Sequence, residues 1–275
     1  MATFTVTTHA NYLEDIWTRG VSMALENNLV LGRRVLRLDE EARKGNVLNY
    51  PRLANIAASS VSAGGAFTPT ANTEGNVVIT IDRHFITSIE VDDIVALQSK
   101  YDSFSMYSGK LGYGLALQFE TDLAGLYSGL GQQVGTAGVP VNDDPLLNCI
   151  QLIDQADSPG EDRTADFRPA SKRALMKIDK FVDAAKMGLN GKSPATTGLF
   201  GEIYGIPIFF SNTIVDSAGV HNLIFWKEAF VAAKQKDVSV EDFGRTGLKV
   251  TKTLAAQAVW GYSENRDTSA VDFVS

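Results

Sequence analysis

Apolar residues occupy alternate positions over an unusually long stretch in the first third of the chain. From Asn76 to Asp92, only Arg83 and Thr87 break the alternation. The apolar odd positions are Val77, Ile79, Ile81, Phe85, Ile89 and Val91. A period of two is typical of a β-strand, and ordinary strands have only ~5–6 residues. We therefore predict one long strand that projects beyond any compact core.

The segment before this strand is poor in charge. From Asn46 to Asn76 the chain is rich in Ala, Ser, Thr, Asn and Gly, and Arg52 and Glu74 are its only charged residues. A loop of this length is usually either functional or disordered, so an arm that contacts a partner and a floppy linker are both open. With Val47–Tyr50 as the pairing partner of the long strand, the segment reads as an extended β-arm with Gly64 and Gly65 near its tip.

Two helical blocks follow from periods of three and four. The first is Ala10 to Asn27, where apolar residues recur every fourth position, and the charged stretch Arg33 to Glu41 after it reads as a solvated face. The second runs from Asp93 to Leu130, capped by Asp92 or Asp93. It predicts a long helix that the glycines at 109, 112 and 114 kink or interrupt.

The remaining elements are shorter and of mixed type. Asp144 and Pro145 predict an N-cap and first turn for a helix through Gln155. The other predicted elements are a strand at Arg163–Phe167, a helix at Pro169–Lys177, strands at Ile206–Ser211 and Asn222–Trp226, a helix at Lys227–Lys234 and a long strand at Thr246–Tyr262. The chain therefore belongs to the α+β class, and it has no internal repeat of the kind that builds solenoids or propellers.

Composition and charge exclude several classes of protein. The chain has 275 residues, 44% hydrophobic and 21% charged, as in an ordinary globular protein. No stretch approaches the ~20 apolar residues that span a bilayer, and no secretory signal pattern is present. The net charge of −7 argues against a protein that coats nucleic acid. Cys149 is the single cysteine and is expected to be a small buried core residue.

No catalytic or metal-binding pattern stands out. The three histidines, His9, His84 and His221, lie far apart and belong to no metal spacing. Residues Gly191–Ser193 and Gly129–Gly135 resemble fragments of nucleotide-binding loops but lack the strand that should precede them. The acidic pairs 92–93 and 143–144 suit a hard cation, but helix capping is the preferred interpretation. We expect no enzyme activity, no metal and no cofactor.

Two stretches in the second half of the chain are similar to a known family. Residues 181–188 (FVDAAKMG) precede 197–212 (TGLFGEIYGIPIFFSN), which resembles the helix, loop and "G-x-I-x-G-x-P-V-x-x-S-N" strand of tailed-bacteriophage coat proteins. Residues 222–230 and 259–266 resemble the "H-x-x-A-F" and "Y-G-x-x-x-x-R" segments of that family. The charge-poor arm and the long helix after Val91–Asp93 follow the same order, so the resemblance covers nearly the whole chain.

The resemblance implies the Hong-Kong-ninety-seven-type capsid fold. We expect an N-terminal arm at 1–45, an extended β-hairpin loop with its strands at 46–92 and the long spine helix of a peripheral domain at 93–134. An axial domain is expected at 135–240, and the C-terminal strands, 241–275, are expected to return to the peripheral domain. The fold class is therefore α+β with these four parts.

The resemblance also implies a function without catalysis. The chain is expected to be the major capsid protein of a tailed phage, which self-assembles through pentamers and hexamers into an icosahedral shell around double-stranded DNA that it binds without sequence specificity. Its acidic charge is compatible with a wall that does not hold the packaged DNA too firmly. Expected partners are other copies of the chain, a portal and a decoration protein. The expected place is the virion, after assembly in the host cytoplasm.

The arm is expected to make contacts between subunits. Because it carries little charge, it can lie across a neighbouring copy without burying unpaired charges, and Ile56, Val61 and Phe67 are the predicted contacts. A mobile loop tip is the alternative. No lysine occurs from Asn46 to Ile81, so the covalent cross-linking of some family members is not expected here. No long helical extension precedes the arm, so we expect a separate scaffolding protein.

Two other functions compete with this one. An encapsulin-like nanocompartment shell shares the fold but packages a cargo enzyme, and neighbouring genes would separate it from a phage protein. An unrelated α+β enzyme predicts a small oligomer with a cleft that holds titratable groups of perturbed pKa.

Overall fold

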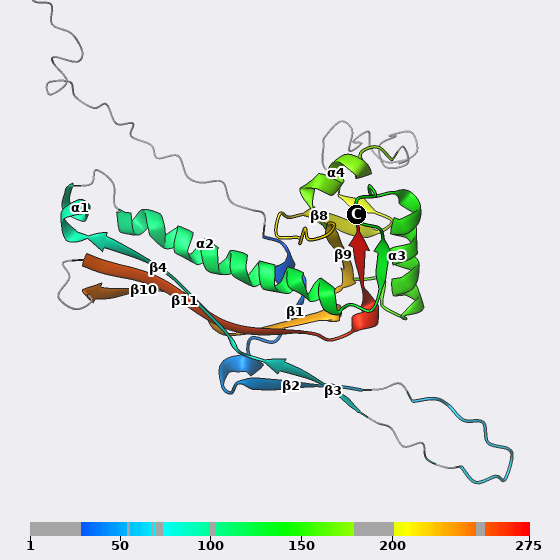
Figure 1. The fold of residues 1–275 in the computed structure, drawn as a ribbon. Helices are drawn as coiled ribbons and strands as arrows, with labels where there is room; N and C mark the ends of the chain where they lie inside the picture. The colour runs from blue at the N-terminus through cyan, green and yellow to red at the C-terminus, as the bar shows by residue number, and fades with distance from the viewer. Residues whose placement is uncertain are drawn as a thin grey trace, which may run out of the picture.

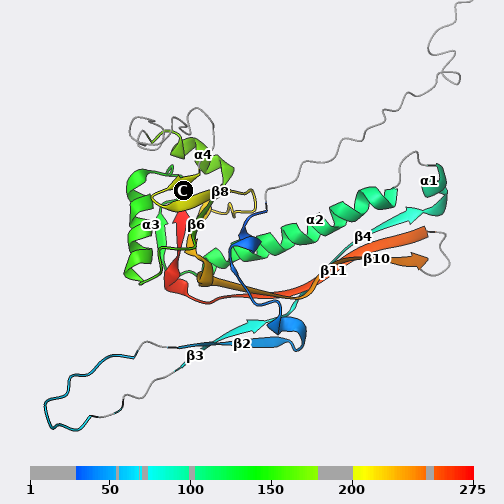
Figure 2. The same ribbon diagram turned by 180° about the vertical axis from the view of Figure 1, so that it is seen from behind.

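The computed structural model describes residues 29–53, 56–67, 69, 74–98, 103–178, 201–245 and 251–275. In this part of the chain, three structures are joined: a sheet of long strands covered by one long helix, a compact unit around a second sheet, and a projecting hairpin (Figures 1 and 2). The predicted helix at Ala10–Asn27, the 181–188 motif and the Gly191–Ser193 motif lie outside the described residues.

The long-stranded sheet has the order β1-β10-β11-β4. Its strands are β1 (Leu36–Arg37), β10 (Phe230–Arg245), β11 (Thr251–Glu264) and β4 (Arg83–Asp92). Strands β4 and β11 pair without interruption, from Asp92 opposite Thr251 to Arg83 opposite Trp260. The described part of the long strand predicted at Thr246–Tyr262 is therefore β11.

Helix α2 (Ser103–Ala124) lies along this sheet and packs on β4, β10 and β11 (Figure 1). Its 22 residues extend about 33 Å at ~1.5 Å per residue. Of the kink or interruption expected at glycines 109, 112 and 114, an interruption is excluded, because the helix continues through all three. A short helix α1 (Asp93–Gln98) precedes α2, and the 3-10 turn η4 (Gly125–Gly129) follows it.

The core between helix and sheet is aromatic at its centre. Trp260 of β11 is 1% exposed and stacks on Phe85 of β4 with ring centroids 5.1 Å apart. Phe119 of α2 meets the same indole edge-on at 5.6 Å. The indole nitrogen of Trp260 also donates a hydrogen bond to Asp122 over 3.0 Å, so the buried polar atom is satisfied. The contacts of Trp260 with Phe119 and Asp122 therefore fix the position of α2 on the sheet.

The compact unit is built on a six-stranded sheet of order β5-β12-β9-β6-β8-β7. Its strands are β5 (Gln133–Gly135), β12 (Ala270–Val274), β9 (His221–Trp226), β6 (Arg163–Phe167), β8 (Ile206–Phe210) and β7 (Glu202–Ile203). Helices α3 (Asp143–Gln155) and α4 (Pro169–Leu175) complete the unit. Its separate core includes Ile153, Phe167, Ile224 and Phe273, each at most 1% exposed.

The stretch from Asn76 to Asp92 forms two strands instead of the one we predicted. Strand β3 (Gly75–Thr80) pairs with β2 (Val47–Arg52), and β4 begins at Arg83 in the long-stranded sheet. Between them, Ile81 is 8% exposed and packs against Ala42 and Ala233. The chain therefore passes from one sheet to another at a buried residue, which an alternating pattern alone does not reveal.

The predicted helix at Lys227–Lys234 is also wrong. A 3-10 turn, η5 (Lys227–Ala229), leads directly into strand β10. The four residues from Phe230 to Ala233 are all at most 1% exposed, so both faces of the strand are covered there. Such a strand lacks alternation, and its pairing with β11 outweighs the helical propensity of its alanines.

Two smaller differences concern the start of α3 and the sheet to which β12 belongs. The cap of α3 is Asn142, whose side chain accepts a hydrogen bond from the backbone nitrogen of Asp143 over 2.9 Å, two residues earlier than predicted. Strand β12 lies in the six-stranded sheet, between β5 and β9, and not in the long-stranded sheet where we expected the C-terminal strands. All five residues of β12 are buried in this sheet, and Asp272 at its centre is the one charged residue among apolar neighbours.

Candidate assembly surfaces

The hairpin β2–β3 carries a loop that extends away from the rest of the molecule (Figures 1 and 2). Val47 lies opposite Thr80 and Tyr50 opposite Val77, so the pairing predicted for the arm is confirmed. At the tip, the backbone nitrogen of Gly65 donates to the carbonyl of Ser62 over 2.9 Å, and Gly64 has a φ of +80°. This turn needs a residue that tolerates a left-handed conformation, which glycine does without strain.

Large apolar side chains on this loop are exposed. Ile56, Val61 and Phe67, the predicted contact residues, are 70%, 50% and 71% exposed, and neighbouring Leu53 is 76% exposed. None of the four belongs to a core cluster of the described residues. Several large apolar side chains exposed along one projecting segment suit a surface that another molecule covers. The structure gives their exposure, while the contacts themselves stay a prediction.

The base of the arm is fixed to the long-stranded sheet. The guanidinium of Arg52 donates a hydrogen bond to the carbonyl of Asn265 over 2.8 Å, and the Asn265 side chain donates to the carbonyl of Glu228 over 2.8 Å. Gly261 of β11 lies so close to the backbone of Thr80 that a Cβ would collide with its carbonyl oxygen. The direction in which the arm leaves the molecule is therefore determined by the Arg52 hydrogen bond and by the close approach of two backbones at Gly261.

A second anchored segment is the stretch that follows the undescribed residues 1–28. The carboxylate of Glu120 in α2 accepts hydrogen bonds from the backbone nitrogens of Val30, Leu31 and Gly32 over 3.2, 2.8 and 2.7 Å. Glu120 is 4% exposed, so these contacts satisfy a buried charge. The segment therefore meets α2 near the C-terminal end of this helix.

The stretch from Arg33 to Glu41 is more than the solvated face we predicted. The guanidinium of Arg34 lies 3.1 Å from Asp166 of β6 and 3.0 Å from the ring centre of Phe209. Asp39 accepts a hydrogen bond from the backbone nitrogen of Lys234 over 2.8 Å. These contacts join the segment to both sheets, and only residues far away in the sequence provide the partners.

Asp166 is the most buried charged group of this junction, with no exposed surface. Burial raises the pKa of Asp166 to about 7, against the opposing attraction of Arg34. Burial also lowers the pKa of Arg34. The pair is therefore held together in a site that disfavours both charges.

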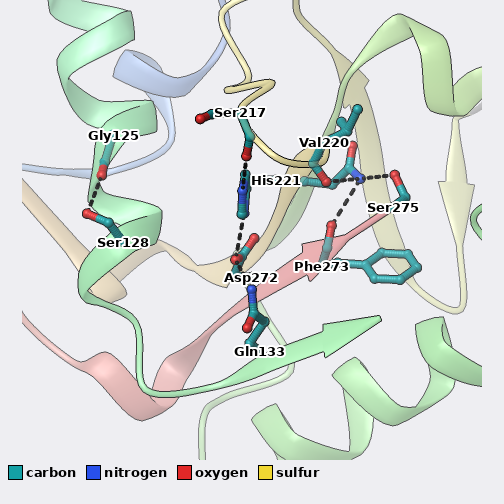
Figure 3. A network of polar contacts seen from close by, with 10 residues as sticks. Gly125, Ser128, Gln133, Ser217, Val220, His221, Asp272, Phe273 and Ser275 are labelled. Carbon is teal, nitrogen blue, oxygen red and sulfur yellow. Dashed lines mark hydrogen bonds and ion pairs between the residues drawn. The ribbon is translucent and has the colours of Figure 1, made fainter. Parts of the chain in front are cut away.

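A polar network lies where the spine meets the compact unit (Figure 3). His221 of β9 faces Asp272 of β12 through Nδ1 at 2.8 Å and the carbonyl of Ser217 through Nε2 at 3.0 Å. Gln133 of β5 donates to the same Asp272 carboxylate over 3.2 Å, and Tyr127 stacks on the imidazole at 4.0 Å between ring centres. Burial raises the pKa of Asp272, opposed by His221. The network joins three strands and the end of the spine.

The other candidate chemical groups are dispersed. His84 is exposed on β4, His221 belongs to the network above, and His9 is outside the described residues. In the part of the chain that the structure describes, no group of three His, Cys, Asp or Glu side chains is placed to hold a metal ion. Cys149 is fully buried, as predicted, and burial raises the pKa of its thiol to about 12.

The acidic pairs are engaged locally. Asp92 accepts a hydrogen bond from the backbone nitrogen of Ile94 over 2.8 Å at the start of α1, so the predicted cap is confirmed. Asp143 accepts a hydrogen bond from the hydroxyl of Tyr204 over 2.6 Å. The Gly129–Gly135 stretch connects η4 to the short strand β5.

None of the helices in the described part of the chain is long and apolar enough to cross a membrane.

Sequence reasoning missed Glu120, Asp166 and Asn222. Each is a polar residue beside a buried apolar one, namely Phe119, Phe167 and Leu223, and the sequence alone does not distinguish such a position from an exposed one. Asn222 is fully buried and accepts hydrogen bonds from the backbone nitrogen of Arg168 and the hydroxyl of Ser171 over 3.0 and 3.2 Å. Such residues are recognised once their partners are known.

No family model matches the sequence, and no curated protein matches it. Solved structures do. A chain of Mycobacterium phage Che8 superposes with a TM-score of 0.82 at 21% identity, covering 96% of this chain and 97% of that one. The capsid structure of the cyanophage P-SCSP1u gives 0.81 at 18% identity over 97% and 94%. The mature capsid of bacteriophage PhiM1 gives 0.76 at 13% identity over 95% and 92%.

At these identities the likeness establishes the fold. The chain has the mixed helix and sheet fold of phage capsid proteins over nearly its whole length, as the resemblance of its motifs predicted.

Proposed function

We propose that this chain is the major capsid protein of a tailed phage and assembles through pentamers and hexamers into an icosahedral shell around double-stranded DNA. The observation that carries the proposal is the likeness to phage capsid chains over 92% or more of both lengths. The projecting arm supports it, since a subunit that exposes such a segment is built to be covered by another molecule.

The arm is the proposed main contact between copies. Ile56, Val61 and Phe67 lie on a segment without nearby charge, so a neighbouring copy can cover them without desolvating an ion. Closed shells repeat one heterologous contact many times, and each such contact can be weak. Because no lysine lies between Asn46 and Ile81, the shell is proposed to be held without covalent links. A ladder of covalent oligomers on a denaturing gel of mature particles would contradict this.

The division into parts is proposed along the two cores. Residues 1–45 form the N-terminal arm, 46–92 the extended loop with its strands, 93–134 the spine, 135–240 the axial domain and 241–275 the C-terminal strands. Strands β10 and β12 cross this division, since β10 pairs in the long-stranded sheet and β12 in the compact unit. The chain thus passes between the two cores more than once. These crossings support the proposal that the two cores form one connected unit.

The proposed partners are other copies of the chain, a separate scaffolding protein, a portal and a decoration protein. The DNA inside is proposed to be held without sequence specificity, as expected for a wall with a net charge of −7. Assembly is proposed in the host cytoplasm, and the mature protein in the virion. We assign the chain no reaction and no cofactor.

Particle contents test this proposal against its rivals. The chain is co-produced with the proteins of its neighbouring genes, and particles are isolated by sedimentation and treated with nuclease. Protected double-stranded DNA in closed particles is the expected result. Particles that contain an enzyme and no DNA would favour an encapsulin-like compartment, and a small oligomer that never forms particles would favour an unrelated enzyme.

A further inference from the structure

A pocket of about 320 Å³ opens beside α4, in the compact unit and away from the arm. Its walls are mostly apolar and come from Val139, Pro140, Val141, Ala170, Ala174 and Val220. Pockets with apolar walls and a few charged groups at the rim are the usual form of a binding site. The volume suits one leucine-sized or phenylalanine-sized side chain with part of its backbone.

The buried side chain of Asn222 is hydrogen-bonded to two residues of the pocket lining. The Asn222 amide nitrogen donates to the carbonyl of Phe273 and the hydroxyl of Ser275, both over 3.1 Å, and its amide oxygen accepts from Ser171 over 3.2 Å. Ser171 and Ser275 are themselves lining residues. The pocket is therefore largely formed before anything binds, which reduces the entropy lost on binding.

Two basic residues that line the pocket, Arg173 and Lys177, have no carboxylate partner among the described residues. The stretch from Arg168 to Lys177 carries four basic residues and no acidic one, in a chain whose net charge is −7. Arg168 pairs with Asp216 at 3.4 Å, and Lys172 lies 5.6 Å from the Phe210 ring centre. Arg173 and Lys177, both exposed, line the pocket and complete this positive surface.

We propose that this pocket binds an acidic peptide segment of another protein, with an apolar side chain in the pocket and flanking carboxylates on Arg173 and Lys177. Charged pairs at the rim of such a site select the partner, and the buried side chain supplies affinity. This inference goes beyond the proposed shell function and does not rest on it, because it uses only the shape and charge of the compact unit.

The chemistry of the pocket favours a peptide over the alternatives. Nucleic acid would need a run of phosphate contacts or an aromatic stacking surface, and no aromatic residue lines the pocket. The arm of another copy fits poorly, since Glu74 is its only acidic residue between Asn46 and Asn76. The arm of another copy is therefore not the proposed occupant, and we propose a segment of a different protein that combines an apolar side chain with several carboxylates.

The test uses a fluorescein-labelled nonapeptide with a central leucine and two glutamates on each side, titrated by anisotropy with the purified full chain at low salt. We expect saturable binding with a Kd below about 1 mM. Replacing the glutamates by glutamine, or the leucine by alanine, is expected to weaken binding at least about tenfold, because both parts contribute. No saturable binding, or equal binding of the three peptides, would overturn the proposal.

Variants of the chain provide the matched comparison. R173E/K177E reverses the two rim charges, A170F fills the pocket from an exposed position, and R43E/K44E makes the same charge change at exposed residues outside the pocket. The first two are expected to weaken peptide binding at least about tenfold, and the third to leave it unchanged. An equal loss in R43E/K44E would contradict the site. So would efficient competition by duplex DNA, or a change in self-association caused by R173E/K177E without peptide.

Discussion

The carboxylate of Glu120, near the C-terminal end of α2, accepts a hydrogen bond from the backbone nitrogen of Leu31 over 2.8 Å. The nitrogens of Val30 and Gly32 donate to the same carboxylate, so one side chain satisfies three consecutive backbone donors. Gly32 packs so closely on the spine that an added Cβ would lie 2.9 Å from the Phe119 ring. The point at which the N-terminal segment meets the spine is thus defined by one carboxylate and one glycine.

We predict that Glu120→Ala lowers the free energy of unfolding by about 2–4 kcal/mol, because buried donors lose their acceptor. Chemical denaturation of the unassembled chain measures this. Glu74→Ala, at an exposed position in the arm, is the control and is expected to change stability by less than about 0.5 kcal/mol. Equal, small effects of the two substitutions would show that the three contacts do not stabilise the chain.

Replacing a glycine by alanine is predicted to lower the stability of the chain at one position and to raise it at another. Gly261→Ala is expected to destabilise the chain by about 1–3 kcal/mol, since the new methyl group collides with the backbone of Thr80 and lies 3.0 Å from the Cα of Ile81. Gly109→Ala, in the middle of α2 with no atom within 4 Å of the new carbon, is expected to stabilise it by about 0.5–1 kcal/mol. Thermal unfolding compares both with the parent. Destabilisation by Gly109→Ala would mean that the spine does not continue through this position.

How much of this structure the sequence predicts depends on the range of the interactions. Strand β6, the α3 end at Gln155 and the β2–β3 pairing follow from local pattern and turn residues, and all three are found. The helix predicted at Lys227–Lys234 fails because Phe230–Ala233 is buried on both faces by residues distant in sequence. The core against α2 covers one face, and Ala42 and Ile81 cover the other. Alternation and helical periodicity describe one exposed and one buried face, so they fail where both faces are covered.

The candidate surfaces divide in the same way. The exposed apolar arm was predicted from its lack of charge, which is a property of the sequence alone. The anchors of that arm and of the N-terminal segment were not, because Arg52 meets Asn265 and Arg34 meets Asp166 only after folding. Charged residues in a mixed-charge stretch give no sequence signal that separates a solvated side chain from a buried pair.

Asp166 is predicted to make stability fall as pH rises. Its pKa in the folded chain is raised from 3.8 to about 7, so between these values the folded chain binds more protons than the unfolded chain. The contribution of Asp166 is therefore fully present below about pH 4 and is lost as pH rises through about 7. At about 1.36 kcal/mol per pKa unit, the loss is at most about 4 kcal/mol.

Asp166→Asn removes this titration and provides the comparison. The stability of the parent relative to the variant, measured by denaturation at several pH values from 4 to 8, is expected to decrease with pH. No decrease over this range would show that the attraction of Arg34, 3.1 Å away, outweighs burial and keeps Asp166 ionised.

The arm is predicted to act in assembly and not in folding. I56S/V61S/F67S removes three side chains that are at least 50% exposed, so the free energy of unfolding is expected to change by less than about 0.5 kcal/mol. Assembly is expected to be lost, since each apolar contact is repeated throughout the shell. S59A/S60A, in the same segment, is the control and is expected to assemble. Normal assembly of the triple variant would show that these side chains are not the contacts.

Negative-stain electron microscopy of the purified chain, together with sedimentation and with a candidate scaffolding protein from the neighbouring genes, tests the central claim most directly. The account predicts closed shells, or rings of five and six copies, when the scaffolding protein is present. A single small oligomer under every condition, with or without that protein, would contradict a capsid function for this chain.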